Sequence, residues 1–335
     1  MKKFTYQVGI DVAKSTLDCT FLQEGKKLNY QRIANTPKAV NSYLRQLEKQ
    51  GVRCCDTLFC MEHTGVYNAH ILQVLIQNKA NIWLEAALRI KESLGFTRGK
   101  NDKVDSYRIA RYAYLHQDSA MLWVPRREVV QQLTRLTMLR KRLVKTKVAL
   151  LQPLAETKQF LGNRAFRQER ALTDPIASTL KKQIKRVEKQ IEEAIKSDEH
   201  LSYLFELVTS VEAIGPVTAG HLLVVTNEFR NFSCPKKFAC YAGTAPFENS
   251  SGTSIRGKSR VSPYANKDTK KLLHMAAMSA INMQNELANY YQRKVSEGKN
   301  KMAVINAVRN KLIKRIFAVV ERGAKYEKNY TPTLA

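Results

Sequence analysis

The chain of 335 residues is poor in glycine and proline, with 14 Gly and 9 Pro. This scarcity argues against a many-turned β architecture and favours long helices, because these two residues most often punctuate a chain. The sequence has no run of about 18 apolar residues that would span a bilayer. Its start, Met1-Lys2-Lys3-Phe4, has no apolar signal-peptide segment. We therefore expect a cytoplasmic protein with extended helical parts.

Cysteines are also few. The six cysteines lack the paired two-residue spacings and the nearby histidines that are typical of zinc sites. We expect reduced, mostly buried thiols rather than disulfides or a metal-thiolate site.

Acidic residues are scarce relative to basic ones. The chain has 29 Asp and Glu against 56 Lys and Arg, which gives a net charge of +27. The charged fraction of 25% is ordinary, so the imbalance concerns sign rather than amount. The electrostatic field of so positive a protein favours the binding of polyanions. Because the sequence has no membrane segment, the expected polyanion is a nucleic acid.

The first 125 residues alternate strand and helix patterns. Three strand-like stretches at 6–11, 16–22 and 27–34 follow one another across short turns, which predicts an antiparallel meander. Further elements are expected as helices at 37–50 and 67–77 and strands at 58–61 and 81–85. This order predicts an α/β domain with a mixed sheet.

The pattern changes after Pro125. Apolar residues recur every seven positions from Val129 to Leu150, and a second apolar stripe covers 180–194. This spacing predicts two long helices with a coiled-coil character in 126–203, packed on each other or against a partner chain. From 204 to 335 we expect a mostly α-helical domain, interrupted by a flexible Gly/Ser/Thr/Pro-rich stretch at 243–266.

Acidic side chains stand at the ends of the predicted elements of the first domain. Asp11 ends the first strand, Glu62 follows the strand at 58–61, and Asp102 and Asp105 lie three apart at the start of a helix. Neighbouring strand ends would bring these carboxylates together, where only a divalent cation relieves their repulsion. Mg²⁺ or Mn²⁺ would suit such oxygen ligands and phosphodiester chemistry.

Other uses of these acids remain open. Asp102 and Asp105 would also favour the positive end of their helix without any metal. The run Gly-Ile-Asp-x-x-Lys-Ser-Thr that contains Asp11 resembles the first phosphate loop of actin-like sugar kinases. Such a kinase would need a second glycine-rich loop, for which the second half offers only residues 242–244.

The basic residues predict nucleic-acid contacts in the second half. A helix, turn and helix at 211–219 place Gly215 in the turn and Pro216 at the first helical position, so backbone N–H groups there could bind phosphate. A serine beside Gly252 lies just before several bases, as a phosphate-attacking serine would need. The basic residues expected to bind nucleic acid are Arg126, Arg127, Arg140, Lys141, Arg142, Arg256, Lys258 and Arg260.

In combination, the motifs resemble the insertion-sequence one-ten transposases, which are bridge-RNA-guided DNA recombinases. The matching segments occur in order and are GIDVAK (9–14), MEHTGVY (61–67), KNDKVDS (100–106), IGPVTA (214–219), FACYAGTAP (238–246), and SG with RGKSR (251–252 and 256–260). The departures are Asn101, Ser106 and the pair Ala265-Asn266, where the family usually has other residues.

The resemblance implies a ribonuclease-H/RuvC-like DEDD domain, a helical coiled-coil segment and a C-terminal serine transposase domain. It implies that Asp11, Glu62, Asp102 and Asp105 bind Mg²⁺ and that Ser251 attacks DNA to form a phosphoserine intermediate, with Ser250 as the adjacent competitor. It also implies a bridge RNA that pairs with donor and target DNA, and a dimer of dimers. The alternative functions are a RuvC-like Holliday-junction nuclease that uses metal-activated water, and a non-enzymatic nucleic-acid binder.

Overall fold

The computed structural model of the chain describes residues 4–93, 101–232, 234–251 and 255–328, without the side chains of 248–251, 255, 256 and 258–260. Its internal contacts form two compact units, unit 1 (Met1–Pro125) and unit 2 (Arg126–Ala335). Within the described ranges, no helix is long and apolar enough to cross a membrane.

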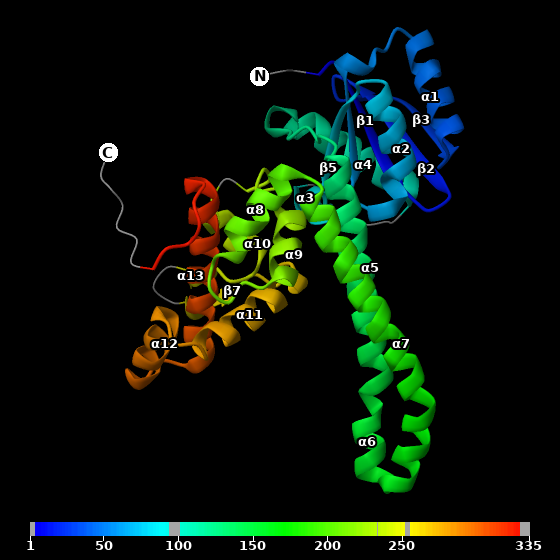
Figure 1. Cartoon of the computed structure of the whole chain (residues 1–335). Helices are drawn as coiled ribbons and strands as arrows, with labels where there is room; N and C mark the ends of the chain where they lie inside the picture. The colour runs from blue at the N-terminus through cyan, green and yellow to red at the C-terminus, as the bar shows by residue number, and fades with distance from the viewer. Residues whose placement is uncertain (1–3, 94–100, 233, 252–254, 329–335) are drawn as a thin grey trace. The chain divides into compact units, whose positions relative to one another are not determined.

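Unit 1 contains a five-stranded mixed sheet in the order β3-β2-β1-β4-β5, coloured blue to cyan in Figure 1. The strands are β1 (Tyr6–Val12), β2 (Thr16–Gln23), β3 (Lys26–Ala34), β4 (Thr57–Glu62) and β5 (Asn81–Glu85). The first three strands pair antiparallel, whereas β4 is parallel to both β1 and β5. The predicted meander and mixed sheet are confirmed.

Helices cover both faces of this sheet because its central strands are buried on both sides. Phe59 and Met61 of β4 join the core formed with α1 (Pro37–Lys49) and α2 (Ala69–Gln77). Their neighbours Leu58 and Cys60 belong to the opposite core, which includes α3 (Ala87–Ser93) and α4 (Asp102–His116). The alternation follows from the two-residue period of a strand.

Unit 2 begins with a long helical hairpin. Its helices are α5 (Glu128–Leu151), α6 (Pro153–Phe160) and α7 (Gly162–Lys196), and α5 packs along α7 (Figure 1). The two long helices predicted here are confirmed, and α7 continues through Pro175. Phe160 and Leu161 near the α6–α7 connection are 75% and 68% exposed.

The remainder of unit 2 is mainly helical. It contains α8 (Glu199–Thr209), α9 (Pro216–Thr226), α10 (Pro235–Tyr241), α11 (Lys267–Ile281), α12 (Glu286–Ser296) and α13 (Lys301–Arg322). Val308, Leu312 and Ile316 of α13 are buried in the principal core of this unit. Val130 and Leu133 of α5 share a second core with α8 and α9, and the hairpin and the following helices lie in one compact unit.

The stretch 243–266, expected as a flexible loop, contains a two-stranded antiparallel hairpin of β6 (Pro246–Ser251) and β7 (Ile255–Val261). Its polar residues show none of the apolar alternation from which a strand is predicted. The hairpin forms through hydrogen bonds between backbone groups, which every non-proline residue can make, so the residue types do not predict it.

Candidate active site

Asp11 lies near the end of β1, directly opposite Asp18 in the antiparallel pair with β2. Its side chain is half-buried. Partial burial raises the pKa of Asp11, and the negative charges of Asp105, Asp102 and Asp18 raise that pKa further. The protein therefore holds Asp11 in a place where its charged form is disfavoured.

Glu62 ends β4, the parallel neighbour of β1. The buried Asn68 fixes the backbone there, since its Nδ2 donates to the carbonyl of Glu62 at 3.0 Å and its Oδ1 accepts from the N–H of Thr64 at 2.7 Å. Burial raises the pKa of Glu62, followed by the charges of Asp11 and Asp105. The expectation that two strand ends bring these carboxylates near each other agrees with this coupling.

Helix α4 carries Asp102 and Asp105 in its first turn. Asn101 caps this helix, with its Oδ1 accepting from the N–H of Lys103 at 3.1 Å. The helix packs directly against β1, because Gly9 has no side chain. A Cβ added to Gly9 would lie 2.1 Å from the backbone nitrogen of Ala110. Because Gly9 lacks a side chain, α4 can pack closely against β1, near the end of which Asp11 lies.

A fifth acid near this site, Asp18, was not predicted as a site residue. Asp18 is 1% exposed and accepts hydrogen bonds from Tyr30 Oη and from Arg32 Nε, the latter at 2.9 Å. Arg32 Nη2 in turn donates to Asp102 Oδ2 at 2.7 Å. Arg32 thus links the buried Asp18 to Asp102. The available signal was an acid within a strand, the same feature that identified Asp11.

The four predicted metal ligands differ in their present contacts. Asp102 is engaged by Arg32, and Asp105 accepts from Arg108 Nη1 at 2.8 Å. Over the part of the chain that the structure describes, no three His, Cys, Asp or Glu side chains lie close enough to hold one metal ion. The donor set nevertheless suits a hard divalent cation, because it consists of carboxylate oxygens whose mutual repulsion a cation would relieve.

Ser251 is the last residue of β6, and its backbone pairs with Ile255 of β7. The Oγ atoms of Ser251 and Ser250 lie outside the description, as do residue Gly252 and the side chains of Arg256, Lys258 and Arg260.

The residues that lead into β6 are firmly held. The carbonyl of Thr244 accepts from Nδ2 of Asn306 and Asn310 on α13 at 2.7 and 2.8 Å. Helix α13 therefore fixes the start of the strand that ends at Ser251.

The basic residues predicted in and just before α5 differ in their contacts. Arg140 pairs with Glu188 at 2.7 Å, and Lys141 pairs with Asp268. Arg142 is exposed. Burial lowers the pKa of Arg126, whose Nη1 donates to Thr134 Oγ1 at 3.3 Å.

Gly215, expected in the turn between two helices, precedes α9, with Pro216 at the first helical position. Gly215 has a φ of −84°, and no atom lies within 4 Å of where its Cβ would stand. The predicted turn is confirmed, but its left-handed residue is Ala213, with a φ of +67°.

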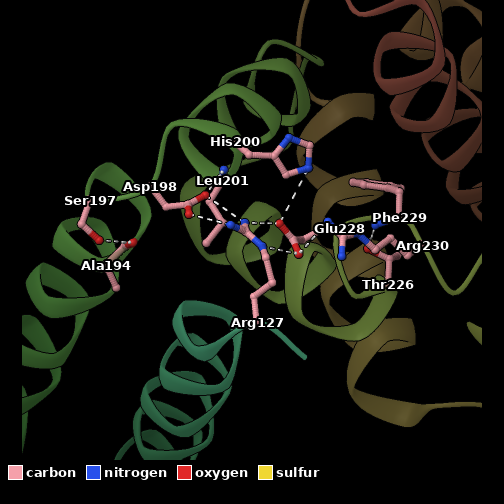
Figure 2. Close-up of polar contacts among 10 residues, drawn as sticks. All are labelled: Arg127, Ala194, Ser197, Asp198, His200, Leu201, Thr226, Glu228, Phe229 and Arg230. Atoms are coloured by element: carbon pink, nitrogen blue, oxygen red, sulfur yellow. Dashed lines mark hydrogen bonds and ion pairs between the residues drawn. The ribbon is translucent and has the colours of Figure 1, made fainter. Parts of the chain in front are cut away.

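Arg127 was expected to contact nucleic acid, but it forms an internal ion-pair cluster (Figure 2). Its Nη1 donates to Asp198 Oδ2 at 2.7 Å, and its Nε donates to Glu228 Oε2 at 3.1 Å. The Glu228 side chain is 0% exposed, and its Oε1 lies 3.7 Å from His200 Nε2. These contacts lower the pKa of Asp198 to about 2, chiefly through the hydrogen bond from Arg127. Arg127 therefore stabilises the fold through its ion pairs with two carboxylates, and its predicted contact with nucleic acid stays a prediction.

The cluster also holds an unusual backbone. Asn227, Glu228 and Phe229 have φ values of 49°, 58° and 62°, all in the left-handed region. Such residues cost of order 1–3 kcal/mol each and persist only where their surroundings fix them.

Two family models match this chain in order. The model of the DEDD transposases of the IS110 family matches residues 8–159, and the model of the transposase IS116/IS110/IS902 family matches residues 205–292. Together they extend over both units, and the chain belongs to the IS110 family of transposases. It is accordingly a DNA recombinase of a family that cuts and transfers DNA strands.

Individual relatives agree with the family. A pilin gene-inverting protein of Moraxella lacunata is 26% identical over 96% of this chain and 97% of its own length. That of Moraxella bovis is 25% identical over the same shares. An uncharacterized protein of insertion element IS110 from Streptomyces coelicolor is 31% identical over 37% of this chain and 30% of its own length. Among solved structures, RuvC of T. thermophilus in complex with a Holliday junction substrate is 12% identical, covers 36% of this chain and 99% of its own, and has a TM-score of 0.28.

Proposed function

We propose that this transposase recombines DNA under the guidance of a bridge RNA, with Asp11, Glu62, Asp102 and Asp105 holding Mg²⁺ or Mn²⁺ and Ser251 as the nucleophile. The observation that carries the metal site is the position of half-buried acids at the ends of β1 and β4, where burial first, and then the charges of neighbouring acids, raise the pKa of Asp11 and Glu62. A cluster of this kind is costly to the fold and is a mark of a functional site.

Three neighbouring features position the four carboxylates. Gly9 admits α4, Asn68 fixes the backbone of Glu62, and the Asp18–Arg32 pair holds Asp102 at the edge of the sheet. A divalent cation held by the four carboxylates would supply positive charge for phosphodiester cleavage.

Ser251 would form the covalent intermediate. Its Oγ attacks the phosphorus of the scissile phosphodiester, and an Oγ–P bond forms while the bond from phosphorus to one deoxyribose oxygen breaks. The departing oxygen takes up a proton, and a deoxyribose oxygen from the second DNA site later reverses the step and releases the serine. Support comes from the rigidly anchored start of β6 and from the bases Arg256, Lys258 and Arg260 that follow in β7.

The proposed partners are donor DNA, target DNA and the bridge RNA, bound in a homo-oligomer that the family resemblance indicates is a dimer of dimers. The net charge of +27 supports polyanion binding. The gene-inverting relatives support strand exchange between two DNA sites. Exposed apolar side chains near the end of the long hairpin, including Phe160 and Leu161, support association between copies.

The deciding experiment is to trap the reaction with labelled DNA under denaturing conditions. We expect a covalent protein–DNA adduct with wild type and with Ser250→Ala, and none with Ser251→Ala. An adduct lost only in Ser250→Ala would move the nucleophile by one residue. Recombination without any adduct would support a RuvC-like nuclease that uses water.

The RNA is tested separately. We expect nucleic acid that copurifies with the protein to contain a structured RNA, and recombination to stop after that RNA is digested and to return when it is added back. Undiminished recombination after complete digestion would contradict RNA guidance while leaving the serine and the carboxylates in place.

A further inference from the structure

Both acids of α4 that are proposed as metal ligands are bonded to arginines. Asp105 accepts from Arg108 Nη1 on the same helix at 2.8 Å. Asp102 instead accepts from Arg32 of the edge strand β3, whose Nη2 lies 2.7 Å from Asp102 Oδ2. A divalent cation that approached the same carboxylate would be repelled by the guanidinium charge. Metal binding at Asp102 is therefore opposed for as long as Arg32 keeps this contact.

Arg32 is anchored at one end of its guanidinium group and accessible at the other. Its Nε donates to both carboxylate oxygens of Asp18, at 2.9 and 3.2 Å, and the Asp18 side chain is 2% exposed. In the second ion pair, the side chains of Arg32 and Asp102 are 50% and 60% exposed. The contact with Asp18 is thus buried, whereas the contact with Asp102 is open to a ligand. Arg32 can exchange its second partner without leaving the first.

Two further cations surround the ring of Tyr30, which lies two positions before Arg32 on β3. Lys27 Nζ is 5.7 Å from the centroid of this ring, and Lys103 Nζ is 5.1 Å from it. Lys27 Nζ also lies 5.6 Å from the centroid of the Tyr107 ring. Both lysines are exposed. Cations interleaved with aromatic rings are typical of surfaces that bind a nucleic-acid strand, so this surface fits such a strand better than an acidic peptide.

We propose that Arg32 couples metal binding to nucleic-acid binding. A backbone phosphate that contacts Lys27 and Lys103 accepts the N–H donors of Arg32 Nη2, and Asp102 Oδ2 is released to the divalent cation. Arg32 keeps its bonds to Asp18 throughout and is a positioning residue. The inference rests on the proposed function for the role of Asp102 as a metal ligand.

The charges favour this exchange. The phosphate brings a negative charge to the guanidinium as Asp102 leaves it, so Arg32 does not lose a counter-ion, and arginine bonds phosphate as well as carboxylate. The released Asp102 gains the cation in place of Arg32. Because the coupling is an equilibrium, a nucleic acid that tightens metal binding is itself bound more tightly, by the same factor, when the metal is present.

The experiment measures Mn²⁺ binding to the full-length protein, freed of nucleic acid, by electron paramagnetic resonance of the free ion. Each titration is carried out without and with an oligothymidylate of about 20 nucleotides, long enough for a strand-binding surface. Mn²⁺ bound by the oligonucleotide alone is subtracted. We expect the oligonucleotide to tighten Mn²⁺ binding to wild type at least about threefold. The measurement does not require DNA cleavage.

Arg32→Lys separates the two contacts of Arg32. A lysine ammonium can retain the pair with the buried Asp18 but has no second nitrogen with which to bridge to Asp102. Without the oligonucleotide, this variant should bind Mn²⁺ about two- to fivefold more tightly than wild type, and with it the two proteins should bind Mn²⁺ equally. Arg53→Lys, which alters the pair with Asp56 in the same unit, should behave as wild type in both titrations.

Two double variants complete the test. Asp18→Asn with Arg32→Gln removes both charges of the buried pair, so no charge is left unpaired, and it should show the same gain in Mn²⁺ affinity. Lys27→Gln with Lys103→Gln should reduce the effect of the oligonucleotide on Mn²⁺ binding. Its control loses the same charge on α1, which packs in the core on the opposite face of the sheet from α4, and should not reduce that effect; it is Lys38→Gln with Lys49→Gln.

The proposal is overturned if Arg32→Lys binds Mn²⁺ more weakly than wild type, or if the oligonucleotide tightens Mn²⁺ binding equally in the two proteins. Equal losses in the two double lysine variants would overturn it as well. These outcomes leave the proposed metal site intact. Mn²⁺ binding that Asp11→Asn does not weaken would instead overturn the proposed metal site, and this inference with it.

Discussion

The chain contains two groups of carboxylates with opposite electrostatics. In unit 1, Asp11 and Glu62 lie among other acids, and burial and repulsion raise their pKa values. In unit 2, Asp198 and the fully buried Glu228 share Arg127, and the pKa of Asp198 falls to about 2. The ion pairs of Asp198 and Glu228 with Arg127 stabilise the fold. The buried charges of Asp11 and Glu62 instead lower the free energy of unfolding. The direction of the pKa shift therefore distinguishes Asp11 and Glu62 from Asp198.

The largest effect is expected at Asp11. Asp11→Asn should lower recombination by more than about 10²-fold, because a ligand for the cation is lost. It should also raise the stability of the fold by about 0.5–2 kcal/mol, since a repelling charge is removed. Recombination assays and thermal unfolding measure the two effects. Mg²⁺ should raise the unfolding temperature of wild type more than that of the variant.

Asp56→Asn is the control for Asp11→Asn, because Asp56 pairs with the exposed Arg53 at 2.6 Å on the surface of unit 1. Neither its activity nor its response to Mg²⁺ should change. A loss of stability in Asp11→Asn would remove the contrast between the two groups of acids.

Arg127→Ala should destabilise the protein by about 3–5 kcal/mol, because it leaves Glu228 buried without its principal cation. Urea unfolding measures this loss. Arg230 lies 3.9 Å from the same carboxylate but is 58% exposed, so Arg230→Ala should cost less than about 1 kcal/mol. Equal effects of the two variants would show that the cluster is a surface ion pair.

Gly9→Ala tests how the acids of unit 1 are brought together. The added methyl group would collide with the backbone of α4, so we expect a loss of about 1–3 kcal/mol in stability together with weaker Mg²⁺ binding. Gly215→Ala is the matched control, since its Cβ would meet no atom within 4 Å and its φ is negative. Full activity in Gly9→Ala would show that the metal site does not need this close packing.

The smallest effect is expected from Asp198→Asn. Asparagine still caps α8 but loses the ion pair, so the variant should be about 1–2 kcal/mol less stable at neutral pH. The folded-state pKa of Asp198 is about 2, below its ordinary value of 3.8. Its stabilisation is therefore present above pH 3.8 and is lost as the pH falls toward 2. The difference between variant and wild type in urea unfolding should shrink over that range, and a constant difference would contradict this origin.

Local patterns were sufficient to predict most of unit 1. β1 and β4 are short runs of mainly buried residues, and Asp11 and Glu62 stand out because they interrupt or end these runs. The buried Asp18 escaped prediction because its partners depend on the pairing of β2 with β3, which places Arg32 directly opposite it.

Long-range contacts in unit 2 could not be predicted in this way. Arg127 lies 71 positions from Asp198 and 101 from Glu228, and its place in a basic segment favoured a phosphate contact. The β6–β7 hairpin was missed for a different reason, since its residues are mostly polar and show no regular apolar alternation.

The left-handed run Asn227–Glu228–Phe229 has a practical consequence for dividing the protein. A fragment that begins at 204 retains this strained turn and its buried carboxylate but loses both Arg127 and Asp198. The region that the transposase family model matches, 205–292, therefore lies inside a larger compact unit that begins at Arg126. Autonomous expression of this half should succeed only when the fragment begins at Arg126 or earlier.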